Sequence, residues 1–331
     1  ALVRPHRVVG AEPADDQDLP DPAPPLEVGD ALLVATSGST GTPKLLVHTH
    51  RGLRAHASAV HDRLAVDPSR DRWLAWLPLN HLGGFGVVAR SVLSGTPVDV
   101  VASFDADLVA RAPADRGSTL TSAVPTALDR FDPAGFRWVV LGGAADPADR
   151  PPNVVRTYGL TETGGGVVYD GRPLAGVDVR VGADGRVGVR SPTVARGRRG
   201  PDGTVTPIVD AEGWLTTADL GRWGDEGRLE VLGRADHLIV TGGENVWPEP
   251  VEAALRTHPD VADAVVFGEP DPRWGQQVVA VVVARDPADP PSLTALRAAL
   301  ASTLPSFALP RALRLRRRVS RTALGKPIRP Q

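Results

Sequence analysis

Short apolar runs alternate with amphipathic stretches from residue 31 to about residue 160. The apolar runs predict buried strands at 31–35, 73–77, 98–101 and 137–141. Apolar positions at helical spacing predict helices at 51–64, 85–93 and 105–111. This alternation is typical of layered α/β folds with a largely parallel sheet.

The pattern changes after residue 167, where short strands are separated by glycine turns. Strands at 177–181, 186–190, 205–209 and 228–232 predict an antiparallel sheet or a small barrel. A compact unit follows, with strands at 237–240, 261–267, 277–284 and 312–318 and helices at 248–256 and 292–304. We therefore expect an α/β fold, α+β overall, with a large domain at 1–235 and a small one at 236–331. Residues 1–30 read as a tail or linker within the large part.

Composition excludes several classes of function. The chain has 331 residues, a net charge of -2 and no cysteine. A near-neutral charge argues against general nucleic-acid binding, which favours basic domains. The sequence has no apolar run of 18 residues and its first residues have no apolar signal core, so we expect no membrane span and a cytoplasmic protein. Without cysteine, any thioester chemistry must take its sulfur from a cofactor.

The first apolar run leads into a loop of small hydroxylated residues and glycines that ends at Lys44. Gly38 and Gly41 let the backbone approach an anion closely, and Lys44 adds a positive charge. Such a loop is suited to cradle phosphate groups. It is not a Walker A motif, because two residues separate the glycines and Leu45 follows the lysine. A Ser/Thr/Gly surface loop is the alternative.

Four later segments carry further unusual patterns. They are 157–163 (TYGLTET), 213–221 (GWLTTADLG), 233–249 (GRADHLIVTGGENVWPE) and 322–329 (TALGKPIR). Together with the Thr36–Lys44 loop, and in this order, they resemble the adenylate-forming acyl-CoA synthetase superfamily. The resemblance runs from about residue 30 to the end of the chain.

This resemblance implies a fold and a reaction. The fold would be an adenylation domain of layered sheets with a small β-barrel-like part, followed by a mobile α+β lid domain that rotates about Asp236. A carboxylate would attack the α-phosphate of ATP to give an acyl-AMP, and the thiol of coenzyme A would then displace AMP. Charge crowding between oxyanions opposes the first step, and Mg²⁺, lysine and backbone donors would reduce it.

The resemblance also implies residues that hold the nucleotide. The β- and γ-phosphates would be held by Thr36, Ser37, Gly38, Ser39, Thr40, Gly41 and Lys44. Tyr158 would stack near adenine, and Asp219 would accept both ribose hydroxyls, since one carboxylate can take two O–H donors. Arg234 would bind ribose or phosphate. Backbone contacts are implied for Gly142, Gly143, Ala144 and Gly159.

Catalytic roles follow from the same resemblance. Lys326 would bridge the acyl carboxylate and the α-phosphate, Glu162 would ligate Mg²⁺, and Thr161 would touch the α-phosphate. The segment that contains Gly242 and Gly243 would form the face presented for thioester formation.

The acyl substrate is less sharply indicated. Residues 77–91, 141–145 and 158–171 resemble o-succinylbenzoate–CoA ligases of menaquinone biosynthesis, in their short actinobacterial form. His81, Gly143 and Gly164 would lie beside the acyl group. Arg90 would meet the second carboxylate of o-succinylbenzoate, because a buried anion needs a cationic partner. A structural role for His81 and a solvated position for Arg90 are the alternatives.

Other functions remain open. The chain could activate a different aryl acid, or load a carrier protein as a stand-alone adenylating enzyme. A non-catalytic nucleotide-binding relative would be expected to lack Lys326, Glu162 or Asp219, and all three are present. The segment that precedes the phosphate loop is short, and a homodimer could complete this part of the molecule.

Overall fold

The computed structural model describes residues 27–36, 44–143, 150–321 and 329. Its central element is a seven-stranded sheet in the order β4-β3-β5-β6-β7-β8-β9. The strands are β3 (Trp73–Ala75), β4 (Val98–Val100), β5 (Leu120–Ala123), β6 (Trp138–Leu141), β7 (Val154–Leu160), β8 (Gly165–Tyr169) and β9 (Arg172–Pro173). The strands from β4 to β7 run parallel, and β8 and β9 continue the sheet antiparallel.

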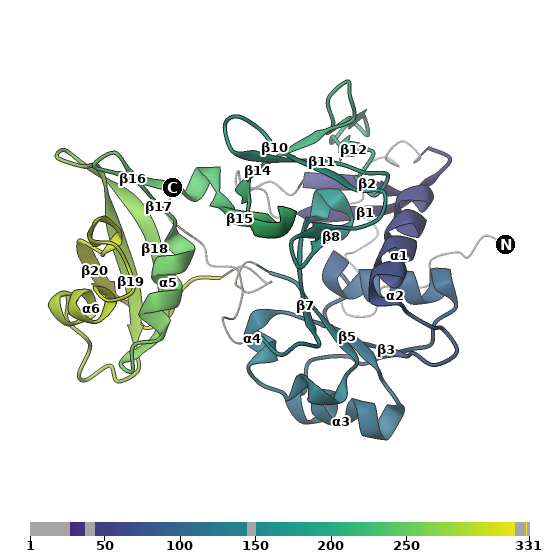
Figure 1. Cartoon of the computed structure of the whole chain (residues 1–331), viewed down its shortest axis with the longest axis horizontal. Helices are drawn as coiled ribbons and strands as arrows, with labels where there is room; N and C mark the ends of the chain where they lie inside the picture. Colours follow the sequence, from purple (N-terminus) through teal and green to yellow (C-terminus); the bar gives the residue numbers. More distant parts are fainter. Residues whose placement is uncertain (1–26, 37–43, 144–149, 322–328, 330–331) are drawn as a thin grey trace, which may run out of the picture.

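Both faces of this sheet are buried, which explains the continuous apolar runs of its strands. Val140 and Val155 pack into one core, and their neighbours Val139 and Val154 pack into another. Successive side chains of a strand point to opposite faces, so one run of residues feeds both cores. The first core is completed by helices α1 (His50–Leu64) and α2 (Leu82–Ser94), and the second by α3 (Ala106–Arg116) and α4 (Pro125–Leu128) (Figure 1).

Two antiparallel sheets adjoin the central one. The first has the order β1-β2-β12-β13, with β1 (Asp30–Thr36), β2 (Lys44–Thr49), β12 (Gly197–Arg199) and β13 (Val205–Thr206). The second has the order β10-β11-β14-β15, with β10 (Asp178–Val181), β11 (Arg186–Arg190), β14 (Leu215–Trp223) and β15 (Leu229–Arg234). The mixed α/β class is confirmed. The expectation that the first strand joins the parallel sheet is wrong, because β1 and β2 pair antiparallel.

The remaining sheet belongs to a C-terminal unit, drawn at the left of Figure 1 beyond β15. Its strands are β16 (Ile239–Thr241), β17 (Glu244–Val246), β18 (Val261–Asp271), β19 (Gly275–Ala284) and β20 (Ala312–Leu315). Helices α5 (Pro248–Arg256) and α6 (Leu293–Leu300) bury Val251, Leu255 and Leu296 in a core of this unit's own. The division into domains at residue 235 stays a prediction.

The helices have local signals at their ends. The Oγ1 atom of Thr49 accepts a hydrogen bond from the backbone N–H of Gly52 and so caps α1, and Ala65 ends that helix at a φ of 49°. Short 3-10 turns occur at η1 (Pro133–Gly135), η2 (Thr161–Thr163), η3 (Asp225–Gly227), η4 (Ala235–His237) and η5 (Ser306–Ala308). Within the described ranges no helix combines the length and apolarity needed to cross a bilayer.

Candidate active site

The carboxyl ends of the parallel strands gather several of the expected residues at one edge of the central sheet. Gly142 and Gly143 directly follow β6, and Thr161 and Glu162 directly follow β7. His81 lies in the connection after β3, where it precedes the first residue of α2. Ligands of open α/β sheets bind outside this edge. The fold therefore brings these residues to the place where a ligand would be expected.

A hydrogen bond joins this edge to the neighbouring antiparallel sheet. The hydroxyl of Tyr158 on β7 donates to Oδ2 of Asp219 on β14 at 2.8 Å. Burial raises the pKa of Tyr158, and the negative charge of Asp219 raises it further, so the phenol stays a neutral donor. Arg234, which lies opposite Asp219 on β15, places Nη1 3.9 Å from Oδ1. The arrangement leaves a largely buried carboxylate between a hydroxyl donor and a cation.

A tight hairpin of β7 and β8 carries Tyr158 and Glu162. Gly159 lies where a Cβ atom would come 2.0 Å from the carbonyl oxygen of Gly165, so a side chain has no room there. The Thr163 hydroxyl accepts from the Leu160 N–H at 2.8 Å and donates to the carbonyl group of Leu160 or Gly165. These contacts fix the turn from which Glu162 extends.

We expect Gly159→Ala to destabilise the protein by about 3 kcal/mol, because the added methyl group must displace backbone atoms. Gly83→Ala is the matched control, since a Cβ there meets a Leu77 methyl group at 3.6 Å inside helix α2. Urea unfolding of the two variants measures the difference. Equal stabilities would show that the close approach of Gly159 to Gly165 does not constrain the hairpin.

Two buried histidines lie against this hairpin. The Nε2 atom of His56 is 3.0 Å from the carbonyl oxygen of Gly166, and the ring of His48 lies next to Gly164. The two side chains are 5% and 1% exposed, which makes both neutral at pH 7. Burial lowers the pKa of each histidine to about 4, and the charge of Arg90 further lowers that of His56. They pack beneath the site as uncharged side chains.

The turn of Glu162 is also tied to the sheet of β1 and β2. Its backbone carbonyl accepts from the Ala195 N–H at 2.8 Å, and the next residue, Arg196, donates its N–H to the Val47 carbonyl on β2. Among the described residues the Glu162 carboxylate makes no hydrogen bond or ion pair, so its oxygens are available to a cation. A hard oxygen donor of this kind fits Mg²⁺.

Strands β1 and β2 pair with each other up to the two ends of the expected phosphate loop. Thr36 lies opposite Lys44 in the register of β1 and β2, and its hydroxyl lies 3.4 Å from the Lys44 carbonyl oxygen. Several expected residues lie outside the described part of the chain, namely Ser37, Gly38, Ser39, Thr40, Gly41, Ala144 and Lys326. Their roles stay predictions.

Two of the residues expected at the acyl group, His81 and Arg90, lie at different depths. His81 is partly exposed at the start of α2, and its side chain does not cap that helix. Arg90 lies nine positions further along the chain, about 13 Å along a helix axis. It is 5% exposed, donates from Nε to the Gly86 carbonyl at 2.8 Å, and stacks on Trp73. The alternative of a solvated arginine is therefore wrong, and its binding of a substrate carboxylate stays a prediction.

The remaining expected residues lie towards the C-terminal unit. Arg234 donates from Nε and Nη2 to the two carboxylate oxygens of Asp236 in η4, both at 2.9 Å. This ion pair lowers the pKa of Asp236 and raises that of Arg234. Gly242 and Gly243 form the turn between β16 and β17, where Trp274 packs over Gly242. The described structure thus places these two glycines in the C-terminal unit and not at the carboxyl edge of β7.

Sequence reasoning missed Thr217. Its hydroxyl accepts from the Asp219 N–H at 3.1 Å and donates to the Val187 carbonyl at 2.8 Å, which fixes β14 at the candidate carboxylate. Threonine hydroxyls commonly accept a hydrogen bond from the backbone N–H two residues later. The sequence Thr217-Ala-Asp219 therefore contained a signal for this bond.

Comparisons with known proteins show which family the chain resembles. The family model described as "AMP-binding enzyme" matches residues 4–213, and the model of the "AMP-binding enzyme C-terminal domain" matches residues 250–326. A probable 2-succinylbenzoate–CoA ligase of Mycobacterium tuberculosis is 46% identical over 321 residues, which cover 89% of this chain and 82% of the relative. A 2-succinylbenzoate–CoA ligase of Bacillus licheniformis is 32% identical, with 99% of this chain and 77% of the relative covered.

Solved structures show the same fold. The o-succinylbenzoate CoA synthetase of Bacillus subtilis in complex with the acyl-adenylate intermediate OSB-AMP aligns with a TM-score of 0.80 and 30% identity. The alignment covers 89% of this chain and 67% of that one. The same enzyme with ATP and a magnesium ion aligns with a TM-score of 0.79 at 29% identity, over 89% of this chain and 68% of that one. The chain belongs to the family of AMP-binding enzymes.

Proposed function

We propose that this protein is an AMP-forming acid–CoA ligase that converts o-succinylbenzoate to its CoA thioester. The observation that carries the proposal is the hydrogen bond from Tyr158 to Asp219 at the carboxyl edge of the central sheet. Tyr158 lies three residues before the turn that contains Glu162. The hydrogen bond would fix Asp219 as an acceptor for the ribose hydroxyls, and the carboxylate of Glu162, unpaired among the described residues, would bind the metal ion.

The first step would join the acid to the nucleotide. An oxygen of the substrate carboxylate attacks the α-phosphorus of ATP, a P–O bond forms, and the bond to the bridging oxygen breaks with its electron pair leaving on pyrophosphate. Asp219 and Tyr158 would hold the ribose and adenine. Glu162 would hold Mg²⁺, which supplies charge neutralisation between the phosphate oxygens. Lys326 would bridge the two reacting anions.

The second step would transfer the acyl group. The sulfur of coenzyme A attacks the acyl carbonyl carbon, a C–S bond forms, the C–O bond to AMP breaks, and the thiol proton is released to solvent. The turn at Gly242 and Gly243 would face the site in this step, after rotation at Asp236. Because the chain has no cysteine, the sulfur has to come from the acceptor.

The choice of o-succinylbenzoate rests on the similarity of the chain to 2-succinylbenzoate–CoA ligases. It is supported by His81 at the carboxyl edge and by Arg90, a largely buried cation on helix α2, which begins directly after His81. Two functions compete with this one: activation of a different aryl acid, and transfer of the acyl group to a carrier protein. We expect the protein to act in the cytoplasm, where ATP and coenzyme A are available, and homodimer formation stays a prediction.

ATP-dependent thioester formation with o-succinylbenzoate and coenzyme A tests the proposal. We expect product with o-succinylbenzoate, little with benzoate, which lacks the second carboxylate, and a loss of about 100-fold or more in Lys326→Ala. If the protein forms a thioester from benzoate but not from o-succinylbenzoate, o-succinylbenzoate is not its substrate. Full activity of Lys326→Ala would overturn the proposed role of the lysine.

A further inference from the structure

Two buried histidine rings lie against the hairpin turn that carries Glu162. At Gly164 a Cβ atom would come 3.8 Å from Nδ1 of His48, and at Gly165 it would come 3.1 Å from Nε2 of His56. The φ angles of these glycines are 75° and 128°, in the region that other residues rarely adopt. The backbone of the turn therefore lies against the two rings with no side chain between them.

Both rings form hydrogen bonds with this backbone. Nε2 of His56 lies 3.0 Å from the Gly166 carbonyl oxygen, which can only accept, so this nitrogen carries the proton. The His48 ring forms a hydrogen bond with the backbone of Thr161, and its Nε2 has no partner among the described residues, so Nδ1 makes this bond. Burial lowers the pKa of His48, and the bond opposes this effect, as expected of a ring that donates to a carbonyl group. The two N–H groups thus hold the backbone one residue before Glu162 and four residues after it.

His48 also connects this turn to the strand that follows the expected phosphate loop. It lies on β2, four residues after Lys44, a separation of about 13 Å along a strand. The Glu162 carbonyl accepts in addition from the Ala195 N–H at 2.8 Å. Strand β2 therefore helps to set where both the lysine and the carboxylate lie.

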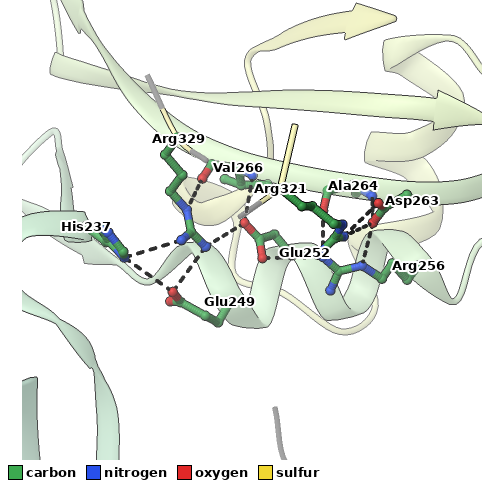
Figure 2. A network of polar contacts seen from close by, with 9 residues as sticks. All are labelled: His237, Glu249, Glu252, Arg256, Asp263, Ala264, Val266, Arg321 and Arg329. Atoms are coloured by element: carbon green, nitrogen blue, oxygen red, sulfur yellow. Dashed lines mark hydrogen bonds and ion pairs between the residues drawn. The ribbon is translucent and has the colours of Figure 1, made fainter. Parts of the chain in front are cut away.

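The two donors are uncharged, which suits a site for a cation. In the C-terminal unit a buried donor is itself a cation, because Arg329 donates to Glu249 at 3.1 Å and to Glu252 at 2.7 Å (Figure 2). Those carboxylates offset the cost of burying its charge. A neutral imidazole needs no counter-ion and does not repel a divalent cation nearby. The backbone of Glu162 is thus held by donors that add no positive charge beneath a candidate metal ligand.

We propose that His48 and His56 are positioning residues that hold the Glu162 carboxylate where Mg²⁺ binds together with ATP. Their role rests on the proposed function of Glu162 as a metal ligand. Neither ring contacts the substrate or the metal ion, and each acts through the backbone of the turn. Loss of the outer partners of a metal ligand typically costs about 10- to 100-fold in metal affinity or activity. Loss of either bond should therefore weaken metal binding more than it slows the chemical step.

Paired substitutions test each bond. In His48→Asn the amide nitrogen takes the place of Nδ1, and in His56→Gln it takes the place of Nε2, so both variants keep a donor. His48→Leu and His56→Leu remove the donor and keep a side chain of similar size. We expect the free Mg²⁺ concentration for half-maximal acyl-adenylate formation to rise about 10- to 100-fold in the leucine variants and to stay near the wild-type value in the amide variants. The kcat at saturating Mg²⁺ should change far less.

His61→Leu is the matched control. His61 is a third buried histidine, 8% exposed, on α1, and its ring stacks on Trp73 in the core. Its Nε2 has no hydrogen-bond partner in the described part of the chain. The substitution therefore removes a buried imidazole without removing a donor from the turn, and we expect the wild-type dependence on Mg²⁺.

A second measurement does not depend on turnover. Isothermal titration calorimetry with α,β-methylene-ATP gives one Kd with Mg²⁺ and one with EDTA, and their ratio is the contribution of the metal ion. We expect this ratio to fall by about 10-fold or more in Glu162→Gln and in the two leucine variants, and to stay unchanged in the amide variants and in His61→Leu. His56→Leu keeps the test valid if His48→Leu does not fold, because His56 lies on α1, where leucine is a favourable residue.

The outcomes separate the role of the histidines from the proposed function. A ratio that falls in Glu162→Gln but not in the leucine variants would overturn the role of the histidines alone. A wild-type ratio in Glu162→Gln would overturn the metal-binding role of Glu162 and the inference with it. Equal losses in the amide variants or in His61→Leu would also overturn the inference, because a packing defect would then explain them. If the wild-type protein does not convert o-succinylbenzoate, the proposed substrate is wrong, and the calorimetric ratios still decide the role of the histidines.

Discussion

We expect Asp219→Ala to lower kcat/KM for ATP by at least about 100-fold, because the two hydrogen bonds that the ribose hydroxyls would donate to this carboxylate, each worth about 1.5–3 kcal/mol, would be lost at once. The variant also leaves the buried hydroxyl of Tyr158 without its acceptor at 2.8 Å. Steady-state kinetics with varied ATP measure the effect. The loss should appear in the adenylate-forming half-reaction.

Asp178→Ala is the control for this variant. Asp178 lies in the same antiparallel sheet and pairs with Arg190 at 2.9 Å, but its side chain is 59% exposed. We expect kcat/KM for ATP to stay near the wild-type value in this variant. If Asp219→Ala and Asp178→Ala behave alike, Asp219 does not bind the nucleotide.

Acidification from pH 7 to pH 5 destabilises the protein by roughly 4 kcal/mol through His48 and His56, or roughly 2 kcal/mol for each. The pKa of both histidines is lowered from 6.5 to about 4 by burial. The unfolded chain therefore takes up protons first as the pH falls below 6.5, and stability is lost progressively until the pH reaches about 4. Urea unfolding across this pH range measures the slope.

A histidine variant isolates the contribution. In His56→Gln the fall in stability between pH 7 and pH 5 should shrink by roughly 2 kcal/mol. NMR titration of the ring protons gives an independent value. A pKa near 6.5 for both buried histidines would contradict the account.

The strongly patterned elements could be predicted from the sequence. The helix expected at 51–64 is α1, and the strand expected at 137–141 is β6. Strand β5 was missed because Thr121 and Ser122 interrupt its apolar run. In the structure Thr121 is fully buried, where its hydroxyl donates to the Leu74 carbonyl and accepts from Trp76 Nε1, each at 3.0 Å. Hydrogen bonding makes a polar strand residue acceptable in the core, and periodicity does not detect it.

The contacts within the candidate site could not be predicted from local sequence patterns either. The motifs indicated Tyr158, Glu162 and Asp219. Nothing in their spacing predicts that the Tyr158 hydroxyl in one sheet donates to the Asp219 carboxylate in another sheet, 61 positions further along the chain. Arg90 was expected either at the substrate or in solvent, and the structure buries it against Trp73. Long-range pairing is decided by how the sheets pack, which a local pattern does not encode.

The most direct test of acyl-adenylate formation uses o-succinylbenzoate labelled with ¹⁸O in its carboxylates. If a carboxylate oxygen attacks the α-phosphorus, that oxygen stays with AMP when coenzyme A displaces it. We therefore predict that mass spectrometry finds one ¹⁸O atom in the AMP released for each thioester formed. Unlabelled AMP, or ADP with the label in inorganic phosphate, would contradict the mechanism.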